Sequence, residues 1–397
     1  MSFFLIVITV LSLMYGYIGW RLIVPAAFSL PVTILLWVLL AVLLVLPVVP
    51  TGLQMRGYQG TGVEIIAWIA FLSFGFLTLL FAILLTKDLF VILATAAQKT
   101  MHFVEHVFNG GSASVNQVDP SRRQLITNWV HLGILGATAA LTGYGIFEAL
   151  RAPKVVEVTI PIDNLPDDLD GLRIVQITDI HVSHTVRRSF VQSVTDTVNA
   201  LSPDLIVLTG DLADGPVRQL RDEVAPLADL RAPLGSFFVT GNHEYYSGVK
   251  EWIEETARLG FTVLLNEHKV IERGSAQLLL AGVTDSGGGQ FDREHISDPQ
   301  KAQSGAPTCH AKVLLAHQPR SIFAAAQAGY DYVISGHTHG GQYFPYHFLA
   351  ALTQPYISGL HEHGNTRIYV SRGTGYWGPQ MRIGARSEIT VHRLTSA

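Results

Sequence analysis

The sequence of 397 residues predicts a bundle of about four transmembrane helices over residues 1–150, followed by an α/β domain over residues 155–397. Three observations support this fold class. Long runs almost without charge fill the first part of the chain. From about residue 155, short apolar runs alternate with amphipathic segments. Polar side chains then gather directly after those short runs.

The apolar runs of the first part are each long enough to cross a bilayer. The chain is 49% hydrophobic and 15% charged, and the apolar excess lies at its front. One crossing needs about 20 apolar residues, which predicts helices at about 3–20, 30–49, 63–86 and 125–148. We therefore expect a multi-pass protein whose helices have the membrane bilayer as their partner.

Charge and cysteine content exclude several other classes of protein. The formal net charge is −4 and no basic tract occurs, so nothing predicts a nucleic-acid partner. Cys309 is the only cysteine, which rules out an internal disulfide and a thiolate-rich zinc site. These observations leave the oligomeric state open.

Positive residues beside the helix ends indicate the orientation, because lysine and arginine favour the cytoplasmic side. With four crossings, five of them lie on the side opposite the C-terminal domain, namely Arg21, Lys87, Lys99, Arg122 and Arg123. Three lie on the same side as that domain, namely Arg56, Arg151 and Lys154. The count predicts that the C-terminal domain lies on the outer face of the membrane.

The segment SRRQLI (121–126), which follows the loop GGSASVNQVDPS, resembles the twin-arginine export signal of bacteria. That signal would place the chain in the bacterial cytoplasmic (inner) membrane with its domain in the periplasm. The alternative is a pair of cytoplasmic arginines that flank a helix. Phenylalanine, which is common in the signal at the position of Leu125, is absent here.

The C-terminal part reads as buried strands alternating with helices. The predicted strands include LRIVQIT, LIVLTG, SFFVTG, KVLLAH and YVISGH, and the predicted helices span 188–201 and 249–259. In such folds ligands bind beyond the carboxyl ends of the strands. The side chains found there are Asp179, His181, Asp211, Asp214, Asn242, His243, His317, His337 and His339.

Taken together, these residues predict a metal centre. Oxygen and imidazole donors without sulfur suit Mn, Fe, Co or Zn, and the donors are numerous enough for two ions. A pair of ions about 3.5–4 Å apart can activate water for in-line attack at phosphorus. In GHTHGG (336–341), the glycines allow the sharp turns that let two histidines one residue apart reach different ions.

The segments DIH, GDLADG, GNHE, HQP and GHTHGGQ together resemble the calcineurin-like metallophosphoesterase superfamily, within it the membrane-associated YkuE/YaeI-type phosphodiesterases of bacteria. The resemblance covers residues 155–397 and departs from the family at Ser387, where proline is usual. It implies a β-sandwich flanked by helices (α/β/β/α). It also implies two divalent cofactor ions (Mn, Fe or Zn) and hydrolysis of a phosphoester substrate, with a phosphodiesterase favoured over a monoesterase.

The resemblance also implies a role for each site residue. Asp179, His181 and His339 would bind the first ion, and Asn242, His317 and His337 the second, with Asp211 bridging the two. His243 would protonate the leaving oxygen, and Asp214 would orient His243. Gln342 and Glu244 are expected to support these ligands.

Other histidines and one glutamate are weaker candidates. HFVEH (102–106) has two histidines at helical spacing but lacks the HExxH order, so an ordinary helix beside the membrane is expected. We expect His184 at the surface, His361 and His363 on a loop near the site, and Glu64 at the membrane interface.

Two functional hypotheses follow. The first is a membrane-anchored hydrolase in which hydroxide between two metal ions attacks a phosphoester, with lipid-linked substrates such as a phospholipid or a UDP-diacylglucosamine-type diphosphate suggested by the membrane. The second is a membrane sensor that binds a phosphate ligand without turnover. Because both Asp211 and His243 are present, the hydrolase is favoured. A transporter is disfavoured because the helices lack paired intramembrane charges.

Overall fold

A computed structural model describes residues 2–109 and 119–397, which divide into two compact units. One unit comprises Met1–Thr51 and Ile69–Tyr144, and the other comprises Gly52–Trp68 and Gly145–Ala397. A short segment that lies between apolar runs in the sequence thus belongs with the C-terminal unit. Within that unit, Gln54 donates from Nε2 to the carbonyl oxygen of Asp214 at 2.8 Å.

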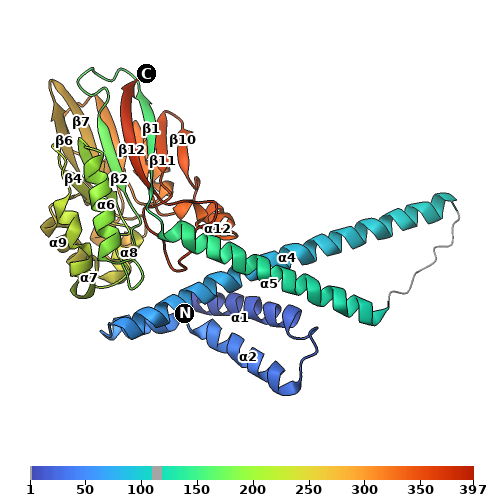
Figure 1. The fold of residues 1–397 in the computed structure, drawn as a ribbon. Helices are drawn as coiled ribbons and strands as arrows, with labels where there is room; N and C mark the ends of the chain where they lie inside the picture. The colour runs from blue at the N-terminus through green and yellow to red at the C-terminus, as the bar shows by residue number, and fades with distance from the viewer. Residues whose placement is uncertain (1, 110–118) are drawn as a thin grey trace. The chain divides into compact units, whose positions relative to one another are not determined.

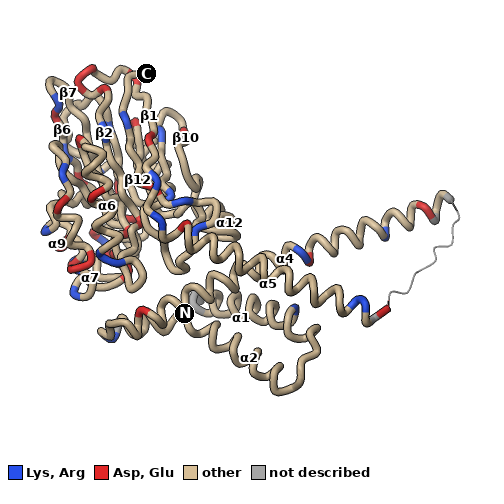
Figure 2. Tube along the Cα trace, viewed as in Figure 1, with Lys and Arg blue, Asp and Glu red and all other residues tan. Residues whose placement is uncertain are grey.

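The N-terminal apolar runs form helices, as the sequence predicts. These are α1 (Ser2–Leu22), α2 (Leu30–Val45), α3 (Val48–Met55), α4 (Thr61–Asn109) and α5 (Pro120–Leu150). Three of the described helices are long and apolar enough to cross a membrane, or four if α2 and α3, bent by 42°, form one span. Charged residues are sparse along α1 and α2 (Figure 2).

Helix α4 is longer than a single crossing requires. Its 49 residues extend for roughly 74 Å at the rise of an α-helix, against a hydrocarbon core of about 30 Å. In the first unit α4 packs on α1 through Ile18, Leu80 and Leu84. Beside this contact, Asp88 pairs with Arg21 and, at 2.8 Å, with Lys87. Two of the positive charges used to predict the orientation therefore share one carboxylate.

The C-terminal unit contains two six-stranded sheets. The first has the order β1 (Lys154–Ile162), β12 (Glu388–Ser396), β2 (Arg173–Ile177), β3 (Leu205–Thr209), β4 (Ser236–Val239) and β5 (Thr262–Val263). The second has the order β10 (Gly359–His363), β11 (Thr366–Val370), β9 (Tyr332–Ser335), β8 (Ala311–Leu315), β7 (Ala276–Gly282) and β6 (Glu267–Arg273). Strands β2–β5 are mutually parallel, as are β7, β8, β9 and β11.

Each central strand buries both of its faces, because its side chains alternate between two cores. In β3, Leu205 and Val207 point to the core between the sheets, while Ile206 and Leu208 point to the core under the helices. The outer face of the first sheet packs on α6 (Arg188–Ala200), α7 (Val217–Val224) and α9 (Val249–Arg258).

The outer face of the second sheet packs on α11 (Ile322–Gln327), near α10 (Pro299–Ala302). Short helices α8 (Asn242–Ser247) and α12 (Tyr346–Thr353) complete the unit. The architecture is therefore the α/β/β/α sandwich that the resemblance implied (Figure 1).

A buried polar network joins the two sheets behind the ends of β3 and β9. Gln176 of β2 donates to the hydroxyl of Thr209 at 2.7 Å and to the carbonyl of Ser335 at 3.0 Å. The side-chain oxygen Oε1 of Gln176 lies 3.1 Å from Nε2 of His392. Nδ1 of the same histidine lies 2.7 Å from the hydroxyl of Tyr332. The network fixes the spacing of the strand ends from which Asp211 and His337 follow.

We predict that Gln176→Ala destabilises the C-terminal unit by about 1–3 kcal/mol, because it leaves the buried hydroxyl of Thr209 and Nε2 of His392 without a hydrogen bond. The thermal unfolding midpoint of the purified chain should fall accordingly. Gln192→Ala is the matched control, since Gln192 is half-buried on α6 and, among the described residues, its side chain bonds only Asp196, at 2.9 Å. An equal effect of the two changes would contradict this account of the network.

Candidate metal centre

The predicted ligands leave their strands on unusual backbone. Ten described non-glycine residues have positive φ, and five of them are Asp179, His181, Asp211, His337 and His339, with φ between 51° and 72°. Left-handed backbone is unfavourable for residues with a Cβ, and such strain clusters at functional sites. The sharp turns direct these side chains toward one another instead of along the strands.

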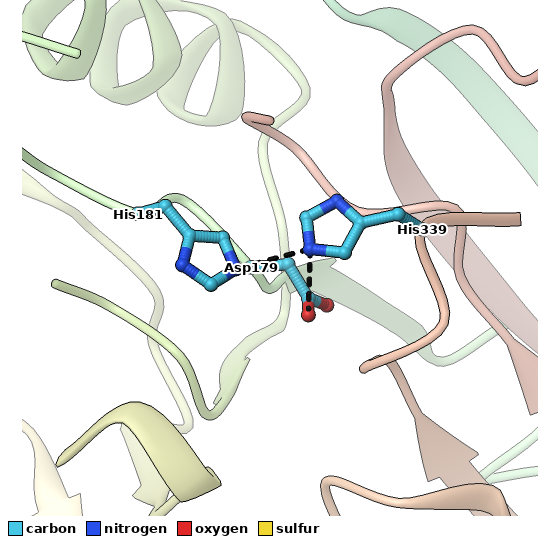
Figure 3. Close-up of side chains that lie close together, drawn as sticks. All are labelled: Asp179, His181 and His339. Carbon is cyan, nitrogen blue, oxygen red and sulfur yellow. Dashed lines mark hydrogen bonds and ion pairs between the residues drawn. The ribbon is translucent and has the colours of Figure 1, made fainter. Parts of the chain in front are cut away.

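Asp179, His181 and His339 form one group of possible ligands, whose donor atoms lie within 4.8 Å of one another (Figure 3). Nε2 of His339 lies 3.0 Å from Nε2 of His181 and 3.5 Å from Oδ1 of Asp179. All three side chains are buried. The backbone N–H of His337 donates to both carboxylate oxygens of Asp179 at 3.0 Å, which ties the ends of β2 and β9 together.

Asp211, His317 and His337 form a second group within the same limit. His317 donates from Nδ1 to the carbonyl of Thr209 at 2.8 Å, and its Nε2 lies 3.0 Å from Oδ2 of Asp211. Both of these neighbours of the ring are acceptors, which favours a doubly protonated imidazole. Burial opposes that charge, but Asp211 outweighs it and raises the pKa of His317 well above its usual value.

Asn242 begins α8 directly after the turn that follows β4. Its Oδ1 is buried and has no hydrogen-bond partner among the described residues. An amide oxygen in that position is costly unless something binds it. A cation would satisfy it, so this orphaned oxygen is an independent observation in favour of a metal.

His243 and His181 share one carboxylate. Asp214 accepts from Nδ1 of His243 at 2.7 Å and from Nδ1 of His181 at 2.8 Å. Burial lowers the pKa of His243, but the carboxylates of Asp211 and Asp214 outweigh burial and raise it to about 9. His243, His181 and Asp211 also form a third group of possible ligands.

Glu244 anchors the loops that carry these residues. Its buried carboxylate accepts from the backbone N–H groups of Gly241 at 2.7 Å, Asp211 at 3.0 Å and Leu212 at 2.8 Å. Burial raises its pKa to about 7. The side chain of Gln342, by contrast, bonds the backbone of Trp377 and Pro379 and holds the C-terminal segment, while its backbone N–H donates to the carbonyl of His339 at 3.0 Å.

Arg382 is a site residue that sequence reasoning missed. It is buried, and its Nη2 lies 3.0 Å from Nδ1 of His339. A guanidinium can only donate, so Nδ1 accepts and the proton of the neutral ring lies on Nε2. The guanidinium also donates to the nearby carbonyls of Gly375 and Ala385, but no local signal identifies Arg382, because its contact with His339 spans 43 residues of the chain.

The donor set fits two divalent cations. Two nitrogens 3.0 Å apart match about the separation of neighbouring ligands bound at roughly 2.1 Å. His181 and His317 each donate from Nδ1 to an oxygen, which directs Nε2 toward the centre as is usual for metal-binding histidine. The structure thus contains groups that could hold metal, and their chemistry leaves the element open.

The weaker candidates lie elsewhere in the structure. His184 was expected at the surface but is buried, and its Nε2 makes no hydrogen bond among the described residues. His361 and His363 were expected on a loop, but they lie in β10, which pairs with β11 across a two-residue turn. Glu64 pairs with Arg187 at 3.0 Å. In HFVEH, His102 is exposed, and the side chain of His106 lies outside the described residues.

Known proteins are similar to this chain in sequence. A family model described as calcineurin-like phosphoesterase matches residues 172–341. An uncharacterized metallophosphoesterase of Helicobacter pylori strain J99 is 37% identical over 78% of this chain and 83% of its own length. The uncharacterized metallophosphoesterase YkuE of Bacillus subtilis is 32% identical over 70% of this chain and 98% of its own.

A vertebrate relative is also similar. A transmembrane protein with metallophosphoesterase domain from Danio rerio is 44% identical over 64% of this chain, and the match spans 60% of that relative's length. The chain belongs to the calcineurin-like metallophosphoesterases, a family of metal-dependent phosphoester hydrolases. With its long apolar helices, it is a membrane protein of that family.

We predict that Asp214→Asn weakens metal binding by about 10–100-fold, because an amide orients His181 less firmly than a carboxylate does. Titration of the metal-free chain with Mn²⁺ measures the change. Asp204→Asn is the control, since that carboxylate is also partly buried but accepts from the backbone of Arg173 at 2.8 Å, far along β2 from the centre. Unchanged affinity in Asp214→Asn would refute the orienting role.

Metal uptake should also release a proton, because Asp211 raises the pKa of His317 and an imidazole must give up the proton on the nitrogen that binds the metal. Affinity is then expected to fall as the pH is lowered, by about tenfold per pH unit for each proton displaced. Calorimetry in buffers of different ionisation enthalpy between about pH 6 and 8 counts the protons. Affinity that does not change over this interval would show that the ligands are already deprotonated.

Proposed function

We propose that this chain is a membrane-anchored phosphodiesterase that uses two divalent ions to hydrolyse a lipid-linked phosphoester. The single observation that carries the proposal is the position of Asp211. Its carboxylate belongs to two of the possible ligand groups and lies 3.0 Å from Nε2 of His317. One carboxylate at the junction of two groups is what a shared pair of ions requires.

The ligand assignment follows from the groups. Asp179, His181 and His339 would hold one ion, while His317, His337 and the orphaned Oδ1 of Asn242 would hold the other. Asp211 would contact both. When bound, the ions would supply Lewis acidity that lowers the pKa of a water and neutralises charge on a phosphoryl group. Mn, Fe and Zn all accept this mixture of imidazole and oxygen donors.

His243 is the proposed general acid. Its Nδ1 is committed to Asp214 at 2.7 Å, so the proton on Nε2 is free to pass to the leaving oxygen. Its backbone N–H donates to Oδ1 of Asp211 at 2.9 Å, which keeps the ring beside the centre. The raised pKa of about 9 keeps this proton in place at neutral pH. The aromatic rings of Tyr246 and Trp377 flank the imidazole.

The membrane helices support the choice of a lipid-linked substrate, because they hold the chain at a bilayer where such phosphoesters reside. We place the chain as a multi-pass protein of a bacterial inner membrane, with the catalytic unit on the periplasmic face. This orientation rests on the distribution of lysine and arginine.

We predict that Asp211→Asn and His243→Ala fail in different ways. Asp211→Asn should lose both metal and activity, because it removes a charge shared by two groups. His243→Ala should retain metal while turnover falls by about 10²–10⁴-fold, because proton delivery is lost. Metal analysis and hydrolysis of mono- and diester panels by the detergent-purified chain distinguish the two.

His310→Ala serves as the control, because this exposed histidine lies at the opposite end of β8 from His317. Full activity in His243→Ala would exclude the proposed acid. The absence of hydrolysis for every mono- and diester in a metal-loaded chain would refute the proposed function itself.

A further inference from the structure

A groove extends away from the candidate metal centre. A cavity of about 230 Å³ is lined by Asn242 and His337 from the centre, together with Arg320 and Phe291. A larger cavity of about 740 Å³ also has Arg320 in its lining, as well as Ser286 and Gln290 of the first. The two are therefore neighbours that meet at Arg320, and the larger lies in the usual range of ligand pockets, about 300–1,000 Å³.

The larger cavity has exposed apolar side chains in its lining. Ile296, Phe323 and Leu352 line the larger cavity and are respectively 61%, 47% and 82% exposed. They come from three separate segments, namely the loop before α10, helix α11 and helix α12. The side chains of Phe348 and Leu349 on α12 are exposed too. Exposed apolar side chains that gather beside a cavity usually mark a binding surface.

Arg320 is the only charged residue that lines the larger cavity among the described residues. Its Nη2 donates to the carbonyl of Thr353 at 3.2 Å, and no described carboxylate pairs with it. The nearby carboxylate of Asp285 is buried and accepts from Gln318 and from the backbone of Gly287. The guanidinium of Arg320 therefore keeps an unneutralised positive charge where the smaller cavity, which reaches the metal centre, meets the larger one.

We propose that this groove binds one aliphatic chain of the phosphoester substrate. The aliphatic chain of the substrate lies along Ile296, Phe323 and Leu352. Arg320 binds an anionic oxygen of the substrate between this aliphatic chain and the scissile phosphate. This role of the groove rests on the proposed function, and it adds the residues that contact the alkyl part of the substrate. Charge complementarity and continuity with the centre both favour this occupant.

The proposal makes chain length a determinant of specificity. Each methylene that leaves water for an apolar surface strengthens binding by up to about fourfold. The gain should continue until the groove is filled and should then stop. A soluble ester without an alkyl tail reaches the centre but not Leu352.

The test uses alkyl p-nitrophenyl phosphodiesters, from methyl to decyl, with the full chain in nanodiscs. For the unaltered chain, kcat/KM should rise by about two- to fourfold per methylene and then level off. Leu352→Ser and Phe323→Ser should flatten this rise while leaving hydrolysis of the methyl ester unchanged. Because all variants share one kind of nanodisc, partitioning of the esters into lipid is the same for each.

Leu360→Ser is the matched control, since Leu360 is an exposed leucine of β10 that does not line the groove. Binding of alkylphosphonates of increasing length, measured by calorimetry on metal-free chain, provides a readout that does not depend on turnover. If kcat/KM and phosphonate affinity still rise with alkyl length in Leu352→Ser, the proposed role of the groove is wrong, although the proposed hydrolase activity is unaffected.

Equal effects of Leu352→Ser on the methyl and the decyl ester would show that Leu352 does not discriminate by alkyl length and would also overturn the proposal. If the unaltered protein hydrolyses none of the esters, including the methyl ester, the proposed function is wrong and this inference falls with it.

Discussion

The rest of the C-terminal unit depends on the burial of two carboxylates, Asp179 and Asp211, at neighbouring strand ends. An ionised carboxylate removed from water must gain positive charge or hydrogen bonds. The structure supplies both, because backbone N–H groups of His337 and His243 donate to these oxygens, and imidazoles face them at 3.0 and 3.5 Å. His317 is the ring whose charge Asp211 stabilises most directly. Divalent ions would meet the same electrostatic need more completely than protons do.

The turns that carry these side chains have unfavourable backbone conformations, and interactions within the surrounding sandwich offset that free energy. Left-handed residues cost about 1–3 kcal/mol each, and five of the candidate ligands adopt that conformation. Glu244 holds the turns after β3 and β4 by three backbone hydrogen bonds. The network of Gln176 links β2, β3 and β9 from behind. A rigid scaffold thus keeps the ligand atoms close enough to share cations.

Much of this fold could be predicted, mainly where a strand is an apolar run. The apolar runs of β2, β3, β4, β8 and β9 are unmistakable, whereas β6, β10, β11 and β12 are mixed in polarity and were not identified. Two-residue turns at 274–275 and 364–365, both containing glycine, were the available hairpin signals. His184 was placed at the surface because a single histidine carries no pattern that reveals its burial.

The sequence by itself determined the class of donor atom and the strand ends that present it, because those properties depend on residues adjacent in the chain. It also determined that apolar helices precede the catalytic unit. Only the tertiary structure decided that Asp214 serves two histidines, that Arg382 contacts His339, and that Arg320 opens a groove beside the centre. Those contacts join segments that are far apart in the chain, so their distances depend on how the two sheets pack and leave no local signature.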